Sequence, residues 1–421
     1  MRRRYGLVRY LLGAGAARTG DEMSGPALLL TGTALTGSAS TGSALLAAVT
    51  ASAALGGPVL GTLLDRTPHP GRLLGGALAA YAGALTLVWW SLGELPLPAA
   101  LFTALVGGLF APALASGWTA QLPRLTDPGR LPRAGALDAA SYECAALAGP
   151  ALAGGAALAA GPEAALLTSV TLIALASPMA WSLPKAGETG RQSEEAQTEE
   201  ARLSHNQPAP PAPRPAPPPH PTPSPLRTDL RTGFTTLLRT CPLARATLTS
   251  TLSHTGLGAF TAVTPYLGER AFGDGNAGSF LLAVLALTSL AASLALARWP
   301  VRASPDAVLV AGVVLLGVAF LVSAASPLAG ALIAGAGAGP QLVVLFAIRH
   351  REAPERLRGQ IFSTGASLKI SGYAAGAGSA ALCPPQVTLL VAAGCQALAV
   401  LGFLALSRTA DRPKSRSGAC G

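Results

Sequence analysis

The chain has 421 residues, of which half are hydrophobic and only 12% are charged. A soluble protein carries about twice that share of charged residues, so the composition argues against a soluble enzyme. The formal net charge of +10 comes from basic residues in short clusters between apolar runs, without the interleaved aromatic residues of a nucleic-acid-binding module. With 49 glycines and 5% aromatic residues, the composition instead favours helices that pack closely within lipid.

Apolar segments follow one another along nearly the whole chain. A window of about 19 residues finds twelve of them, and each can cross a hydrocarbon core of about 30 Å. The predicted spans are 9–34, 43–64, 73–92, 97–120, 136–160, 164–183, 243–268, 276–298, 306–325, 327–348, 359–382 and 387–407. The predicted fold class is therefore an all-α membrane protein with twelve transmembrane helices.

The distribution of Lys and Arg predicts the orientation of these spans. Of 30 such residues, Arg18 and Lys369 lie deep within spans and Arg270 lies in a loop on the far side. The others fall on the side of the N-terminus, in the tails, in the loops after the even-numbered spans and at the adjoining span ends, where Arg9, Arg245 and Arg298 lie. Because basic loops stay in the cytoplasm, we expect a cell-membrane protein with both termini cytoplasmic.

A polar segment divides six spans from six. It begins with an acidic stretch after Lys185 and continues as QPAPPAPRPAPPPHPTPSP at 207–225, a composition that forms neither helix nor sheet. We expect an N-terminal six-helix bundle at 1–184, a disordered proline-rich cytoplasmic linker at 185–239, a C-terminal six-helix bundle at 240–408 and a cytoplasmic tail at 409–421.

The two sets of spans share a short motif at the same topological position. Pro128-Gly-Arg130-Leu follows the fourth span, and Pro354-Glu-Arg356-Leu follows the tenth. In both places a basic loop leads into a helix rich in small residues. Internal repeats of this kind are common in transporters, so we expect two pseudo-symmetric halves.

The loop after the second span has a second motif, GTLLDRTPHPGR, which begins at Gly61. Its carboxylate, Asp65, can accept hydrogen bonds from the backbone N–H groups at the start of a neighbouring helix, where the helix dipole favours a negative charge. Arg66 and Arg72 can bridge to acids of adjacent helices or to lipid headgroups. Two extra residues precede Gly71, compared with the family motif that this loop resembles.

That family is the major facilitator superfamily, and the chain resembles its twelve-span drug and metabolite exporters. The resemblance implies two six-helix bundles, transport by alternating access and a cytoplasmic latch made by the loop motif. The segment GPALAGG in the fifth span looks like a motif of antiporters in this superfamily, with Gly149, Pro150 and Gly154 as its matching residues and Ala153 where glycine is usual. The arginine that many drug/proton antiporters have in the fourth span is missing.

Three charged residues lie together in the first span. Arg18 precedes Asp21 by three residues and Glu22 by four, so all three can meet on one helix face. An ionisable side chain at membrane depth costs several kcal/mol and is therefore a candidate for function. We expect Arg18 to neutralise one acid and leave the other as the proton-coupling group, with a structural ion pair as the alternative.

Further charges lie within the fifth, seventh and eleventh spans. Glu143 and Lys369 stand at similar depths after Arg133 and Arg358, and either can contact substrate or pair with a charge across the cavity. Lys369 can alternatively extend toward the cytoplasmic interface. His254 is a candidate proton relay or a packing residue.

The sequence therefore predicts a secondary transporter that exports a small amphipathic molecule in exchange for protons. No nucleotide-binding P-loop, paired catalytic carboxylates or metal-ligand spacing occurs, so we expect no enzyme, cofactor or metal. The expected partners are the substrate, protons and the bilayer, without nucleic acid, and we expect a monomer. The alternatives are a proton-coupled uptake symporter and a membrane sensor or scaffold that acts through the proline-rich linker.

Overall fold

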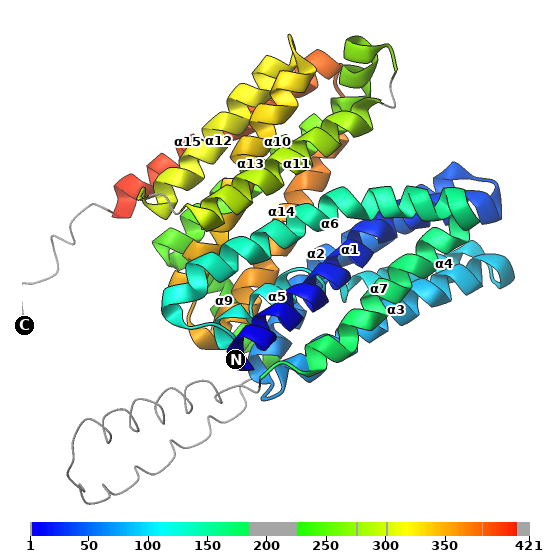
Figure 1. The fold of residues 1–421 in the computed structure, drawn as a ribbon, viewed down its shortest axis with the longest axis horizontal. Coiled ribbons are helices and arrows are strands. Elements are labelled where there is room, and N and C mark those ends of the chain that lie inside the picture. Colours follow the sequence, from blue (N-terminus) through cyan, green and yellow to red (C-terminus); the bar gives the residue numbers. More distant parts are fainter. Residues whose placement is uncertain (1, 185–224, 275–276, 300–301, 381, 411–421) are drawn as a thin grey trace, which may run out of the picture.

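The computed structural model describes residues 2–184, 225–274, 277–299, 302–380 and 382–410, and these residues are helical almost throughout (Figure 1). The first six rods form the N half: α1 (Arg2–Thr36), α2 (Ala39–Arg66), α3 (Pro70–Glu94), a broken fourth rod, α6 (Leu131–Ala160) and α7 (Pro162–Trp181). The last six form the C half: α10 (Cys241–Phe272), α11 (Ala277–Arg298), α12 (Pro305–Ser323), α13 (Pro327–Glu352), α14 (Arg358–Ser379) and α15 (Pro385–Ala410).

Proline and glycine mark where these rods begin and end. Proline is the first residue of α3, α7, α12, α13 and α15. At this position the backbone N–H has no hydrogen-bond partner within the helix, so its absence from proline costs nothing. Gly273 ends α10 with a φ of 71°, and Gly161 separates α6 from α7 with a φ of 91°, both in the region that favours glycine. The chain can therefore reverse direction in very few residues at the membrane surface.

The fourth rod differs from the continuous span expected at 97–120. It consists of α4 (Leu97–Gly108), η1 (Ala111–Ala113), α5 (Ser116–Thr119) and η2 (Leu122–Arg124). Pro112 and Pro123 lie in the two 3-10 turns, and because proline has no N–H, neither can continue an α-helical ladder. The irregular backbone is buried in protein, where such breaks are tolerated in a membrane.

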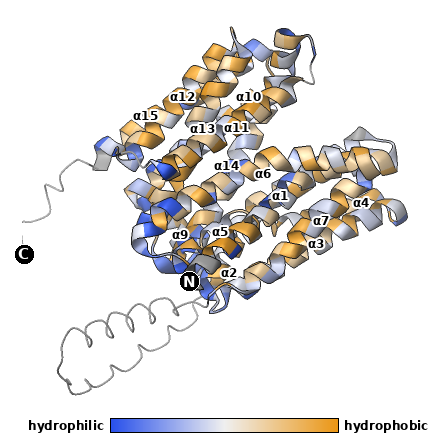
Figure 2. Ribbon diagram, viewed as in Figure 1, coloured by the Kyte–Doolittle hydropathy of each residue, from blue (hydrophilic) through white to orange (hydrophobic). Residues whose placement is uncertain are grey.

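Nine of the described helical segments are long and apolar enough to cross a membrane by length and composition. The long helices outside this set are α1, α10 and α14, which carry the charged residues singled out in the first, seventh and eleventh spans. Figure 2 shows apolar residues over both bundles and hydrophilic residues gathered where the N-terminus and α9 lie. A helix with charged residues at membrane depth must face protein or water, so these three helices belong to the interior.

Each half has its own apolar core, and the halves join at one end. One core lies within the N half and another within the C half. A third, smaller core joins Ala136 and Ala139 of α6 to Ala297 of α11 and Phe346 of α13. The bundles meet at the end where the N-terminus and α9 lie, here called the linker end, and diverge toward the opposite, far end (Figure 1). The predicted fold class is confirmed.

Small residues make the closest contact between the halves, along α2 and α14. Residues at every fourth position of α2 face α14: Ala53, Gly57, Gly61 and Asp65. Their counterparts on α14 also lie at every fourth position: Gly359, Ser363 and Ser367. A Cβ atom on Gly61 would lie 2.6 Å from the carbonyl oxygen of Gly359, so the two backbones touch. Such close approach is how helices associate within lipid.

The C-terminal part of the linker predicted at 185–239 is helical, not disordered. Residues 226–239 form α9 (Leu226–Arg239), because no proline lies between Pro225 and Pro242 and apolar residues recur at helical spacing. Leu237 and Gly233 of α9 are buried against the bundle. The stretch from 185 to 224 and the tail from 411 onward lie outside the described residues. The repeat motif predicted at 128 and 354 corresponds to two 3-10 turns, η3 (Pro128–Arg130) and η4 (Glu355–Leu357), that lead into α6 and α14.

Close helix contact at glycine gives a prediction about stability. A Cβ atom on Gly56 of α2 would lie 2.1 Å from the carbonyl oxygen of Leu109, whereas one on Gly83 of α3 would meet nothing within 4 Å. We expect Gly56→Ala to lower the free energy of unfolding by about 1–3 kcal/mol through overpacking. Gly83→Ala should be neutral or stabilising by up to about 1 kcal/mol. Melting temperatures of the purified variants in detergent would check this, and equal values would contradict it.

Candidate functional site

The linker end is held closed by one carboxylate from the loop motif. Asp65, at the end of α2, accepts hydrogen bonds from the backbone N–H groups of Gly359 (2.7 Å) and Gln360 (2.8 Å). Both N–H groups belong to the first turn of α14, where the helix dipole favours a negative charge. The cationic side chains of Arg124 and Arg358 add electrostatic attraction. This is the geometry expected for Asp65 from the sequence, and it joins the two halves directly.

The next residue joins the same junction to α9. The guanidinium of Arg66 donates to Asp229 of α9 at 2.7 Å. The side chain of Gln360 donates to the carbonyl oxygen of Leu230 at 2.8 Å, and it packs on Gly233. Helix α9 therefore lies across the junction of α2 and α14. We call the residues that form these polar contacts the latch: Asp65, Arg66, Asp229, Gly359 and Gln360.

The remaining residues of the loop motif do not join the halves. Gly71 packs α3 against α7 within the N half, since a Cβ atom there would lie 2.4 Å from the carbonyl oxygen of Ala180. Arg72 is exposed. Gly61, Asp65 and Arg66 of the motif therefore lie at the junction between the halves. Gly71 has a packing role within the N half, and Arg72 lies on the surface.

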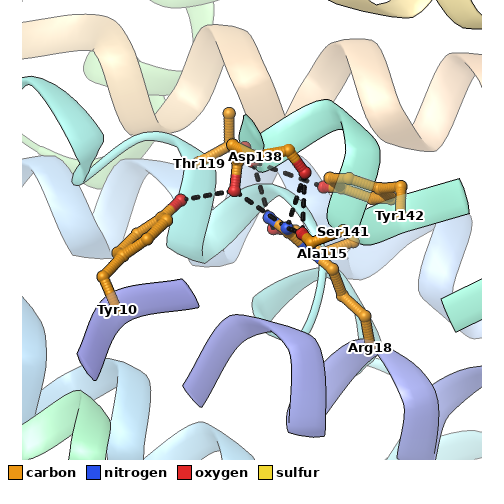
Figure 3. Close-up of polar contacts among 7 residues, drawn as sticks. All are labelled: Tyr10, Arg18, Ala115, Thr119, Asp138, Ser141 and Tyr142. Carbon is orange, nitrogen blue, oxygen red and sulfur yellow. Dashed lines mark hydrogen bonds and ion pairs between the residues drawn. The ribbon is translucent and has the colours of Figure 1, made fainter. Parts of the chain in front are cut away.

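A buried polar network lies within the N half (Figure 3). Arg18 forms a salt bridge to Asp138 of α6 at 2.8 Å, with 2% and 0% of the two side chains exposed. Asp138 also accepts hydrogen bonds from Tyr10 and Thr119, both at 2.8 Å. Arg18 donates to Thr119 at 3.0 Å and to the hydroxyl of Ser141. The network ties α1 to α5 and α6.

This network corrects the expectation that Arg18 pairs with Asp21 or Glu22. The arginine side chain extends away from these two acids toward α6, because Asp138 is fully buried there and needs a counterion. In sequence, the place of Asp138 near the start of the fifth span suggests only a helix cap or a latch partner. Among the ion pairs of the described residues, none includes Asp21 or Glu22.

Tyr142 connects this network to the C half. Its ring centroid lies 3.8 Å from the guanidinium carbon of Arg18 and 5.5 Å from the ring of Phe346 on α13. The second contact crosses between halves. The Arg18–Asp138 network thus fixes the α6 surface against which α13 packs.

Charged residues of both halves meet near the middle of the molecule, at what we call the central charged site: Asp21, Glu22, Glu143, His254, Arg349 and Lys369. Asp21 lies beside Glu22 and Tyr81, and Glu143 interacts electrostatically with Glu22 and with Lys369 of α14. His254 of α10 lies near Lys369 and contacts the carbonyl oxygen of Ser250 at 2.9 Å. Arg349 is buried and Glu22 is exposed, while the other four residues are partly exposed.

The antiporter-like segment touches this site at one residue. A Cβ atom on Gly149 would lie 2.5 Å from the Cβ of Glu22, so α1 and α6 cross in direct contact there. Pro150 lies inside α6, next to this crossing. Gly154 has open space where a Cβ would be. Gly149 therefore has the close packing role that its residue type suggests, and Gly154 does not.

Arg349 is a site residue that sequence reasoning missed. It lies in the basic run at the end of α13, which reads as a surface cluster, yet only 1% of it is exposed. Its Nε and Nη2 atoms are buried without a hydrogen-bond partner among the described residues. Its guanidinium packs over Gly365, where a Cβ atom would lie 2.2 Å from Nη2.

Within the part of the chain that the structure describes, no three His, Cys, Asp or Glu side chains gather as a metal ion would require.

Comparison with known proteins gives a family match and a shared fold. A sequence model of the Major Facilitator Superfamily matches residues 10–377. No curated protein matches the chain in sequence. Similar solved structures include a bacterial homologue of the iron transporter ferroportin in the outward-facing state, with 16% identity, a TM-score of 0.72 and coverage of 96% of this chain and 99% of that one.

Two further structures are similar over their whole length. The human organic anion transporter MFSD10 shares 17% identity with a TM-score of 0.65, covering 96% of this chain and 100% of that one. The proton:xylose symporter XylE shares 11% identity with a TM-score of 0.67, covering 95% of each chain. At these identities the likeness establishes the fold.

The latch gives a prediction about conformation. Asp65→Asn keeps one acceptor oxygen but removes the charge, which should weaken the junction by about 1.5–3 kcal/mol. Arg133 and Arg351 are exposed at the linker end of opposite halves. Each is replaced by cysteine in a cysteine-free background and spin-labelled, and pulsed electron paramagnetic resonance measures the distance between the two labels. We expect Asp65→Asn to add a population at longer distance. Glu94→Gln at the far end is the control, and an unchanged distance distribution for Asp65→Asn would contradict the latch.

The buried network gives a prediction about stability. Removal of one member of a buried ion pair leaves an uncompensated charge, which costs about 3–5 kcal/mol. We expect Arg18→Met and Asp138→Asn each to lower the melting temperature in detergent strongly. The double variant should be more stable than the sum of the two losses implies, because neither charge then remains alone. Strict additivity would show that the two residues do not act as a pair.

Proposed function

This chain belongs to the Major Facilitator Superfamily, and we propose that it exports a small amphipathic molecule in exchange for protons. Membership in this family indicates a transporter rather than an enzyme. The proposal adds the direction of transport, the coupling ion and the kind of substrate. The observation that carries it is the central charged site, where Glu22 interacts electrostatically with Tyr373 of the C half. Among the described residues, neither Glu22 nor its neighbour Asp21 forms an ion pair.

The distribution of basic residues supports a cytoplasmic linker end in the cell membrane. Positively charged loops are retained on the cytoplasmic side, and α9 and the N-terminus lie at this end. With the halves joined at the latch and diverging toward the far end, the molecule then has its central site closed to the cytoplasm. Opening the latch and closing the far end would expose the same site to the other side.

Protons are the proposed coupling ion because acids at membrane depth are rare and costly unless they function. In the outward-facing state, Asp21 and Glu22 take up protons from outside. Binding of substrate from the cytoplasmic side releases them after the latch has opened. The exchange needs no nucleotide, in keeping with a sequence that has no P-loop.

The contact between Glu22 and Gly149 supports exchange rather than uptake. Because the α1 backbone at Glu22 touches α6 at Gly149, a change of charge at Glu22 acts directly on the crossing of these helices. The antiporter-like segment thus lies where protonation can alter packing. XylE, one of the similar structures, is a proton:xylose symporter, so uptake is the alternative that the experiment must separate.

Everted membrane vesicles with an acidic interior test both direction and coupling. An exporter of this kind moves added substrate into the vesicle and protons out, so a panel of amphipathic molecules should include some that dissipate the pH gradient. A symporter gives no response to substrate added on this side and responds in right-side-out vesicles. Silence in both preparations would favour a sensor or scaffold and overturn the proposal.

We expect Asp21→Asn to abolish this dissipation, because an amide cannot take up the proton that substrate must displace. The readout is the fluorescence of a pH-sensitive dye after each active molecule is added. Glu94→Gln, at an exposed position in the last turn of α3, is the matched control and should behave as the unmodified protein. Unchanged gradient dissipation by Asp21→Asn would remove this residue from coupling.

A further inference from the structure

The central charged site is electrically divided between the halves. Its acids, Asp21, Glu22 and Glu143, all belong to α1 and α6 of the N half. Its bases, Arg349 and Lys369, belong to α13 and α14 of the C half, with His254 of α10 beside them. The acidic residues of the described C half lie in its loops and near the ends of its helices: Glu269, Asp274, Asp306, Glu352 and Glu355.

Among the described residues, no acid of the C half forms an ion pair with the cations of this site. Arg349 is buried, and its Nε and Nη2 atoms have no partner among the described residues. A buried guanidinium without an anion is unfavourable and is expected to be kept only for a purpose. Glu143 of the opposite half interacts electrostatically with Lys369 and forms no direct ion pair with it among the described residues.

Helix α14 brings the two cations together. Gly365 and Lys369 are four residues apart and lie on the same helix face, about 5–6 Å from each other. The guanidinium of Arg349 lies over Gly365, which has no side chain to exclude it. Lys369 is the partly exposed member of the pair, and Arg349 is buried beside Gly365, one helical turn closer to the start of α14.

We propose that the transported molecule is a zwitterion, whose anionic group is held by Lys369 with Arg349 behind it and whose cationic group is held by Glu22 with Asp21 beside it. Charge complementarity carries this inference, because a molecule with both charges satisfies the two sides of the site at once. A purely cationic molecule leaves Arg349 uncompensated, and a purely anionic one meets the repulsion of three carboxylates.

The inference rests on the proposed function and explains one step of it. In an exchanger, substrate and proton must not occupy the same acids together. A cationic group on the substrate competes directly with protons at Glu22 and Asp21, whereas its anionic group binds the C half independently. The two halves would then hold opposite ends of one molecule while the central site changes access.

Four matched probes test the charge requirement by binding alone. Phenylalanine is zwitterionic, phenylalaninamide is cationic, N-acetylphenylalanine is anionic and N-acetylphenylalaninamide is neutral, while all four share one apolar side chain. The full chain in detergent is titrated with each, and the increase in melting temperature gives an apparent Kd. We expect phenylalanine to bind at least about tenfold more tightly than either singly charged probe, and the neutral probe to bind most weakly.

Two variants assign each charge to its side of the site. Lys369→Met should remove the preference for phenylalanine over phenylalaninamide, and Glu22→Gln should remove the preference for phenylalanine over N-acetylphenylalanine. Arg302→Met and Glu94→Gln, both at exposed positions outside the site, are controls that should keep both preferences. Arg349→Met should act in the same direction as Lys369→Met.

The outcomes separate this inference from the proposed function. Equal binding of the four probes, the absence of binding by all four, or preferences that survive both variants would overturn the zwitterion. Binding preferences as expected, without dissipation of a pH gradient in vesicles, would overturn proton exchange and leave the zwitterion site standing. Dissipation by singly charged molecules alone would overturn the zwitterion and leave the exchanger standing.

Discussion

The cost of placing charge within a bilayer determines how this molecule is organised. An ionisable side chain there must face protein or water, so the helices that carry such residues are drawn to the interior. Arg18 and Asp138 satisfy each other inside the N half, where both are buried. Among the described residues, the other deep charges form no ion pair, and Glu143 interacts electrostatically with Glu22 of its own half and Lys369 of the other. The boundary between the two bundles is thus where charge is left uncompensated, and that is where a polar ligand can bind.

A second constraint comes from the absence of a hydrophobic driving force between helices in lipid. The halves meet instead through backbone contact at small residues, along α2 and α14. Such an interface has little side-chain interlocking, so its separation breaks only the small apolar core that joins α6 to α11 and α13. Its strongest polar connection is the carboxylate of Asp65 on the start of α14. An interface of small residues with one charged group bridging it suits a junction that must open and close.

Span positions, the two halves and the geometry of Asp65 were predictable, because they depend on apolar length, repeat position and helix-dipole electrostatics. The partner of Arg18 was not, since spacing along one helix favours Asp21 and Glu22 and cannot show that Asp138 comes close from α6. Arg349 was missed because an arginine in a basic run looks the same in sequence whether it is buried or exposed. The four-residue spacing of Ala53, Gly57, Gly61 and Asp65 was visible, but only the partner helix gives it meaning.

Helix α14 connects these features, since one rigid element carries parts of each. The backbone N–H groups of its first turn bind the carboxylate of Asp65. Its middle packs on α2 and contacts Arg349 at Gly365, and Lys369 lies one turn after Gly365. Ten residues of helix separate Gly359 from Lys369, a distance of about 15 Å. A helix of this length tilts as a unit, so release of its first turn from Asp65 must also move Lys369 relative to the acids of α1 and α6. Latch and charged site are therefore mechanically linked by the same backbone, without any intervening chain of side-chain contacts.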